Sequence, residues 1–126
     1  MRPKTLAEVA QLATRGDSFD HSLANFLDEF YAAPDAKALA ETPILLAPGL
    51  GYSGSVQDAY LAATAEELAR THQFPVPAWT DADARKLHRP WFASPLAALR
   101  AVLLLESPAA FRSRNLFISE NALTRA

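Results

Sequence analysis

Residues 17–33 read DSFDHSLANFLDEFYAA and form the clearest amphipathic pattern in the chain. Large apolar side chains recur there every three or four positions, which is the spacing of one face of an α-helix. Asp17 or Ser18 supplies an N-terminal cap, and Pro34 ends the helix after about residue 33. The acidic side chains fall mostly off the apolar stripe, which comprises Phe19, Leu23, Phe26, Leu27 and Phe30. We therefore predict a helix that packs on its neighbours through this stripe.

Similar signals predict further helices on both sides of this one. Thr5 and Glu8 match a capping box for a helix over residues 5–15, and Gly16 supplies its stop. Other helical segments are expected over residues 35–41, 55–72, 94–106, 108–112 and 120–125. The sequence thus predicts an all-α fold, an irregular bundle of five or six helices.

Serine stands at the expected start of three of these segments. Ser55, Ser94 and Ser107 are each predicted to cap a helix, and Pro95 takes the favoured first position after Ser94. The segment that follows Ser94 is apolar nearly all round, with Arg100 as its basic residue. A helix of that kind is usually buried, so we expect it to be the central helix of the core.

Proline interrupts the helical pattern between these helices. The two prolines of FPVPAW, residues 74–79, force an extended path, and RPWF at residues 89–92 breaks the next helical turn. These segments predict a Pro/Trp-rich loop packed on the helices. Residues 116–118, LFI, form at most one strand, so no real sheet is expected.

Residues 43–54 hold three of the four glycines and are expected to form a flexible loop between helical layers. The pair Gly49 and Gly51 resembles the start of a phosphate-binding loop. It lacks the third glycine, the preceding strand and the lysine of the known fingerprints. We therefore assign no cofactor to this loop.

The length, composition and charge of the chain limit the classes of function that it can have. The 126 residues suit a single helical domain, and the chain has no cysteine, which fits a reducing, cytoplasmic setting. The longest apolar stretch is about half of a membrane span, so a soluble protein is expected. Residues 1–72 carry ten acidic and five basic residues, whereas residues 73–126 carry four acidic and seven basic ones. The chain therefore has an acidic N-terminal half and a C-terminal half rich in proline, aromatic residues and arginine.

The sequence shows no catalytic, cofactor-binding or metal-binding constellation. The three histidines are scattered, with no zinc-ligand spacing. A small enzyme would need Glu66, Glu67 or His72 in a pocket with a perturbed pKa. We expect the protein not to be an enzyme.

The C-terminal half combines tryptophan with arginine, the residues most enriched at interface hot spots. The alternative is that its aromatic side chains fix irregular segments to the core, and that its arginines bind helix carbonyls or nearby carboxylates. The candidate partner-binding residues are Trp79, Arg85, Arg89, Trp91, Arg112, Arg114, Asn115 and Phe117.

The last fifty residues resemble a family of small bacterial proteins. The resemblance rests on FPVPAW at residues 74–79, RPWF at 89–92, ESPAAFR at 106–112, RNLFI at 114–118 and LTRA at 123–126. Members of this family are similar to proteins encoded beside nucleotidyltransferase-like toxins, in gene pairs that resemble toxin–antitoxin operons. Related tails also follow helix-turn-helix domains.

The resemblance implies an antitoxin-like or regulatory protein that binds and neutralises a cognate protein, a nucleotidyltransferase-like toxin. The first alternative is a DNA-binding transcriptional regulator that contacts phosphates through Arg85, Lys86, Arg89, Arg112 and Arg114. DNA binding is disfavoured because the helix over residues 17–33 is acidic and phosphates would repel it. A homo-oligomer and an uncharacterised small enzyme remain open as further alternatives.

Overall fold

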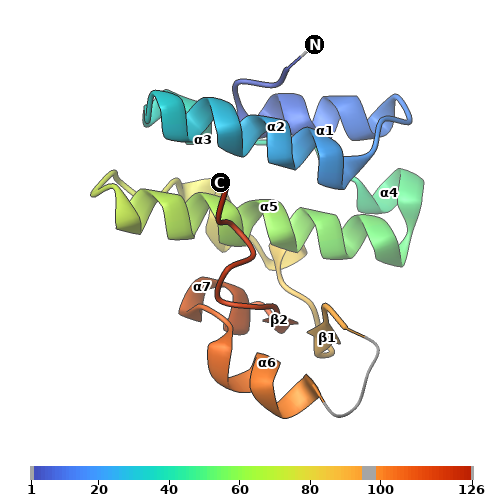
Figure 1. Ribbon diagram of the computed structural model, residues 1–126. Coiled ribbons are helices and arrows are strands. Elements are labelled where there is room, and N and C mark those ends of the chain that lie inside the picture. Colours follow the sequence, from blue (N-terminus) through green and yellow to red (C-terminus); the bar gives the residue numbers. More distant parts are fainter. Residues whose placement is uncertain (1, 95–98, 126) are drawn as a thin grey trace.

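The computed structural model describes residues 2–94 and 99–125, and most of them are helical (Figure 1). The α-helices are α1 (Leu6–Thr14), α2 (Phe19–Ala32), α3 (Lys37–Ala40), α4 (Ala47–Leu50), α5 (Tyr52–Thr71), α6 (Arg100–Glu106) and α7 (Ala109–Arg112). The remaining elements are the 3₁₀ helices η1 (Ala78–Asp81) and η2 (Asp83–Arg85) and the strands β1 (Trp91–Phe92) and β2 (Leu116–Phe117). The mostly helical fold agrees with the sequence, although several helices are shorter than expected and residues 120–123 form turns where the sequence predicted a helix.

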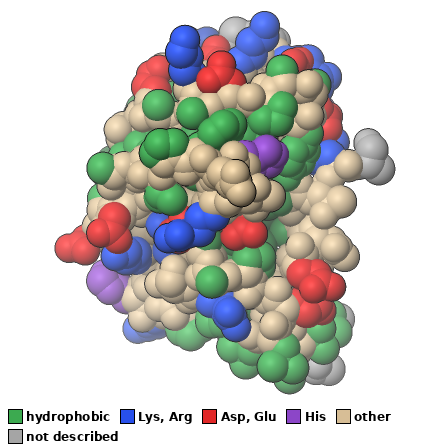
Figure 2. Space-filling model, turned by 90° about the vertical axis from the view of Figure 1, so that its left-hand side faces the viewer, with side chains coloured by type: hydrophobic (Ala, Val, Ile, Leu, Met, Phe, Trp, Pro, Cys, Tyr) green, Lys and Arg blue, Asp and Glu red, His purple; other side chains and the backbone are tan. Residues whose placement is uncertain are grey.

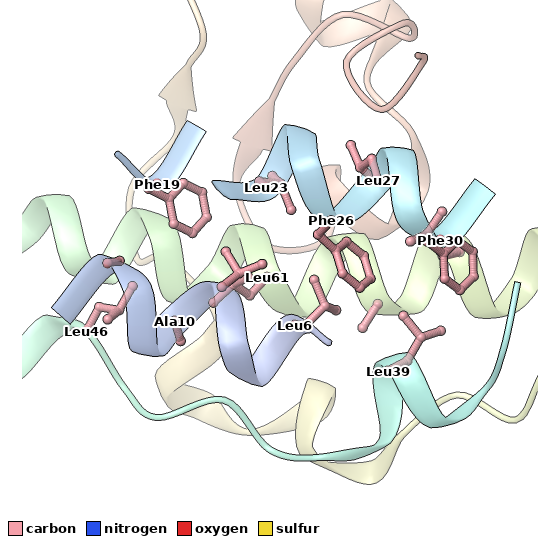
Figure 3. Packing of buried hydrophobic residues seen from close by; sticks show 14 of the residues in the cluster. Leu6, Ala10, Phe19, Leu23, Phe26, Leu27, Phe30, Leu39, Leu46 and Leu61 are labelled. Carbon is pink, nitrogen blue, oxygen red and sulfur yellow. The ribbon is translucent and has the colours of Figure 1, made fainter. Parts of the chain in front are cut away.

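The first two helices follow their sequence signals. The Thr5 hydroxyl accepts a hydrogen bond from Glu8 N, and the Glu8 carboxylate accepts one from Thr5 N, both at 3.1 Å, so the capping box is confirmed. Gly16 has a φ of +94°, a conformation that favours glycine, and it follows α1. Ser18 caps α2 by accepting a hydrogen bond from His21 N. The whole predicted apolar stripe of α2 is buried (Figure 3).

The central element is α5, which lies between α1–α3 on one side and α6, α7 and the strands on the other (Figure 1). Leu61, Ala65 and Leu68 pack into the larger apolar cluster with α1, α2 and α3. Ala59 and Ala63 pack into a second cluster with residues of α7 and β2. Because alanine is small, neighbouring elements approach α5 closely from both sides.

The expectation that the leucine-rich helix after Ser94 forms the centre of the core is wrong. In α6 only Leu103 is buried, and Leu105 is 83% exposed. The predicted start of this helix includes Pro95, which lies outside the described residues. A helix that is apolar all round can be enclosed by the fold or lie on its surface, and its sequence alone does not distinguish the two. In this protein α5 occupies the position between the two layers, so α6 lies outside it.

The segment before α5 is more ordered than the predicted flexible loop, because it contains α4 and is bonded to α5. The Asp58 carboxylate, which is fully buried, accepts hydrogen bonds from Leu46 N at 2.7 Å and from Ala47 N at 3.0 Å. Gly51, with a φ of +63°, lies between α4 and α5. The long helix α5 starts at Tyr52, directly after Gly51. Ser55 was predicted to cap this helix, but it lies inside the first turn and does not cap it.

A buried arginine joins this segment to the η helices. Arg85 Nη1 lies 3.7 Å from Asp58 Oδ1, and Arg85 also donates hydrogen bonds to the carbonyls of Asp58 and Pro43. Its guanidinium carbon lies 4.9 Å from the ring centre of Trp79, whose indole N–H donates a 3.0 Å hydrogen bond to Leu39 O. The segment 78–85 is thus attached both to α5 and to the end of α3.

The C-terminal part contains a short parallel strand pair that the sequence did not predict. Trp91 pairs with Leu116 and Phe92 pairs with Phe117, so the segment expected only to break a helix forms β1. Ser107 was predicted to cap the turn that follows it, but α7 has no side-chain cap. The Ser107 hydroxyl instead donates to Leu116 O at 2.9 Å and accepts from Ile118 N. This serine therefore holds β2 against the end of α6.

We predict that Gly54→Ala destabilises the protein by about 1–3 kcal/mol, as overpacking does. A methyl group at this position would lie 2.6 Å from Ala47 N, in backbone that α5 cannot displace without losing the Asp58 hydrogen bonds. Gly49→Ala is the matched control, because a methyl group there meets nothing within 4 Å. Urea unfolding monitored by circular dichroism measures both; equal effects would contradict the close approach of the two segments.

We also predict strong coupling between Asp58 and Arg85. Removing one member of a buried ion pair leaves the other charge uncompensated, so Asp58→Ala and Arg85→Met should each cost about 3–5 kcal/mol of unfolding free energy. The double variant should cost about 1–3 kcal/mol less than the sum of the single variants. A double-mutant cycle from urea unfolding measures the difference, and simple additivity would show that the two groups do not depend on each other.

Candidate functional site

The helix α6 presents large aliphatic side chains to solvent. We call Leu99, Val102, Leu104 and Leu105 the α6 surface; these side chains are between 41% and 83% exposed. In Figure 2 hydrophobic side chains gather at the lower end of the molecule, where Figure 1 places α6. Adjacent exposed aliphatic side chains of this size are typical of protein–protein contact sites.

Arginine and aromatic side chains adjoin the α6 surface. The guanidinium carbon of Arg100, an exposed residue of α6, lies 5.1 Å from the ring centre of Phe92. Phe92 in turn stacks on Phe117 at 5.1 Å between ring centres. Arg112 is exposed on α7, which follows α6 directly. Exposed aliphatic side chains with charged neighbours at both ends of α6, Arg100 and Glu106, match the usual anatomy of an interface, with a hydrophobic middle and a polar rim.

Two of the predicted partner-binding arginines are buried. Arg85 is 2% exposed and Arg114 is 3% exposed. Arg114 Nη1 donates to Glu66 Oε1 at 2.8 Å and to Ala110 O, and its Nη2 donates to Thr80 O at 2.9 Å. In this structure both guanidinium groups therefore bind the protein's own carbonyls and carboxylates.

Two more of the predicted residues organise the strand pair. Asn115 has a φ of +63° and donates a 2.7 Å hydrogen bond from Nδ2 to Leu87 O, while Trp91 N donates to Asn115 O at 2.8 Å. Phe117 is buried in β2. Asn115 and Phe117 thus position a turn and the strand β2.

The other four predicted residues reach the surface. Trp79 and Trp91 are half-buried, each against one of the two apolar clusters. Arg89 and Arg112 are exposed and form no ion pair with another described residue. The structure does not gather the eight predicted residues into one patch of exposed side chains. Of those that remain accessible, Trp91 lies in β1, Arg89 precedes β1, Arg112 lies in α7, and Trp79 lies in η1, which is bonded to α3.

The carboxylate named for an enzymatic role, Glu66, is held by two arginines. Arg114 donates to one oxygen at 2.8 Å and Arg70 to the other at 2.9 Å. Burial alone would raise the pKa of Glu66, but these hydrogen bonds outweigh it and hold the pKa below its ordinary value. The pKa of Glu66 is therefore shifted away from neutral pH. His72 bonds to Leu68 O through Nδ1 and packs edge-on against Phe30.

No trio of His, Asp or Glu side chains is close enough to hold a metal ion in residues 2–94 and 99–125. Among the described helices, none has the length and apolar character needed to cross a membrane.

Comparison of the chain with protein-family models, curated proteins and solved structures yields no match. The functional argument therefore rests on the geometry of the chain itself.

Sequence reasoning missed the α6 surface because it placed these leucines in the core. The available signal was the run VLLL at residues 102–105, which covers more of the helix circumference than packing on one side can bury. Such a run indicates either complete enclosure or a face that another surface covers. Only the position of α5 between the two layers decides between these alternatives.

We predict that Glu66→Gln removes a pH-dependent part of the stability. Because the folded-state pKa of Glu66 lies below its ordinary value of 4.5, the carboxylate stabilises the fold above about pH 4.5. That stabilisation, about 1–3 kcal/mol for a charged hydrogen bond, is lost as the pH falls through the folded-state pKa. The difference in unfolding free energy between wild type and variant should be constant from neutral pH to about pH 5.5 and then shrink.

Urea unfolding at a series of pH values measures this difference. Glu67→Gln is the control, since Glu67 is the neighbour of Glu66 and forms no ion pair with another described residue. A pH-independent difference for Glu66→Gln would show that its charge does not contribute to stability.

Proposed function

We propose that this chain is a non-enzymatic, antitoxin-like protein that binds and neutralises a partner protein through the α6 surface. The observation that supports the proposal is the exposure of four large aliphatic side chains, three on the short helix α6 and one, Leu99, directly before it. Covering Leu105 alone would stabilise a complex by about 1–2 kcal/mol through apolar burial. A second surface that removes all four from water would gain several times as much before the costs of association.

The arginines near this surface suit a role in orientation. Arg100 is exposed on α6 and extends over the ring of Phe92, and Arg112 is exposed on α7, which follows α6. Charges at the rim of an interface mainly speed association and fix its geometry, whereas the apolar centre supplies most of the affinity. We infer that the partner presents an apolar pocket bordered by carboxylates.

The chemistry of the partner follows from the resemblance of the last fifty residues to antitoxin-like proteins. We propose a nucleotidyltransferase-like enzyme encoded by a neighbouring gene, acting in the cytoplasm, where a cysteine-free chain suits reducing conditions. Neutralisation would follow if the bound chain covers the nucleotide-binding cleft of that enzyme.

We predict that Leu105→Asp weakens the complex at least tenfold, because it places a charge in the apolar centre of the interface. The measurement is copurification of the tagged chain with the product of the neighbouring gene, followed by titration of the purified pair. Ile44→Asp is the matched control: Ile44 is 48% exposed but lies before α4, away from α6. It should leave the affinity unchanged.

Three outcomes would overturn the proposal. The first is the absence of a complex with the neighbouring gene product. The second is equal weakening by Leu105→Asp and Ile44→Asp, which would separate binding from the α6 surface. The third is a homodimer of the isolated chain that Leu105→Asp dissociates, because the α6 surface would then be covered by a second copy.

A further inference from the structure

A groove separate from the α6 surface lies between α2, the first half of α5, β1 and the segment that follows β2. Its volume is about 660 Å³, within the range of small-molecule sites. Leu23, Val56, Tyr60 and Trp91 supply much of its apolar and aromatic lining. No residue of the α6 surface lines it, so a ligand here would not compete directly with a partner docked on α6.

The polar groups of the groove favour a hydrogen-bond donor with a positive charge. Gln57 Oε1 is buried and accepts no hydrogen bond within the described part of the chain. Asp20 is exposed at the groove and forms no ion pair with another described residue. The one arginine in the lining, Arg125, donates to both oxygens of Asp28 at 2.9 and 3.3 Å, so its charge is already compensated.

The aromatic rings of the groove add to this preference. Tyr60 packs edge-on against Phe19 with ring centres 6.2 Å apart, and Trp91 and Tyr52 also line the groove. The faces of such rings attract cations. Burial, with a smaller contribution from the charge of Asp20, raises the pKa of Tyr60 to about 12. Tyr60 is therefore a neutral phenol at physiological pH and adds no charge of its own.

We propose that this groove binds a small organic amine with an apolar, preferably aromatic, body. The body would lie against Leu23, Val56 and the aromatic rings. The ammonium group would meet the exposed Asp20 carboxylate and the aromatic rings of the lining. This inference does not depend on the proposed function, because it concerns different residues and a different class of ligand.

Phenethylamine and 3-phenylpropionate test the proposal, since they share the ring and chain length but carry opposite charges. The two tryptophans of the chain report binding through their indole N–H resonances in the ¹⁵N-labelled full-length protein. Trp91 lines the groove, whereas Trp79 lies outside it with its N–H bonded to Leu39 O. Phenethylamine should shift the Trp91 signal saturably, with a Kd of about a few millimolar for so small a ligand, and leave Trp79 in place.

Substitutions locate the site and its charge preference. Asp20→Asn should weaken phenethylamine binding about two- to fivefold, the range for an exposed ion pair. Asp17→Asn is the control, because Asp17 is exposed nearby but does not line the groove. Ala24→Phe, which fills the groove from α2, should abolish binding of the amine.

The proposal is overturned if phenylpropionate binds as tightly as phenethylamine, since the groove would then have no preference for cations. It is also overturned if Trp79 shifts as much as Trp91, or if no saturable shift appears up to about 20 mM amine. Binding that survives Ala24→Phe in a folded variant would place the amine elsewhere. None of these outcomes bears on complex formation through α6, which copurification measures independently.

Discussion

The buried contact between Asp58 and Arg85 connects parts of the chain that are otherwise remote from each other. One carboxylate on α5 binds the backbone that leads into α4 and pairs with an arginine from η2. Burial raises the pKa of Asp58 despite these partners, because removal from water penalises the charged form. The pair fixes positions, because one carboxylate on α5 binds both the backbone before α4 and the arginine of η2.

This contact works together with the alanine-rich composition of α5. Alanine contributes little apolar area, but it allows the elements on both sides to come close to the helix axis. Gly54 extends the same principle to the helix start, where no side chain separates α5 from the backbone of Leu46 and Ala47. Polar anchors and small residues together hold the irregular segments in place, where regular helix packing alone would leave them without partners.

The position of α5 has a direct consequence for the surface. Because α5 occupies the middle, α6 packs on the rest of the protein through Leu103 and the strand pair, and its other leucines face solvent. The arginines of the C-terminal half are likewise divided between the interior and the surface. Arg85 and Arg114 hold the interior, while Arg89, Arg100 and Arg112 remain outside, where a partner can reach them.

The sequence by itself determined the features that depend on neighbouring residues. These are the helical class, the amphipathic face of α2, the capping box at Thr5 and the stop at Gly16, because caps and periodicity act over a few positions. The tertiary structure alone decided which helix is central, that Trp91 and Phe92 pair with β2, and that Ser107 binds β2 and does not cap α7. Each of these outcomes joins residues that are distant along the chain. Local patterns state what a segment prefers to form, but only packing decides which of two apolar helices is enclosed and which arginines reach a buried carboxylate.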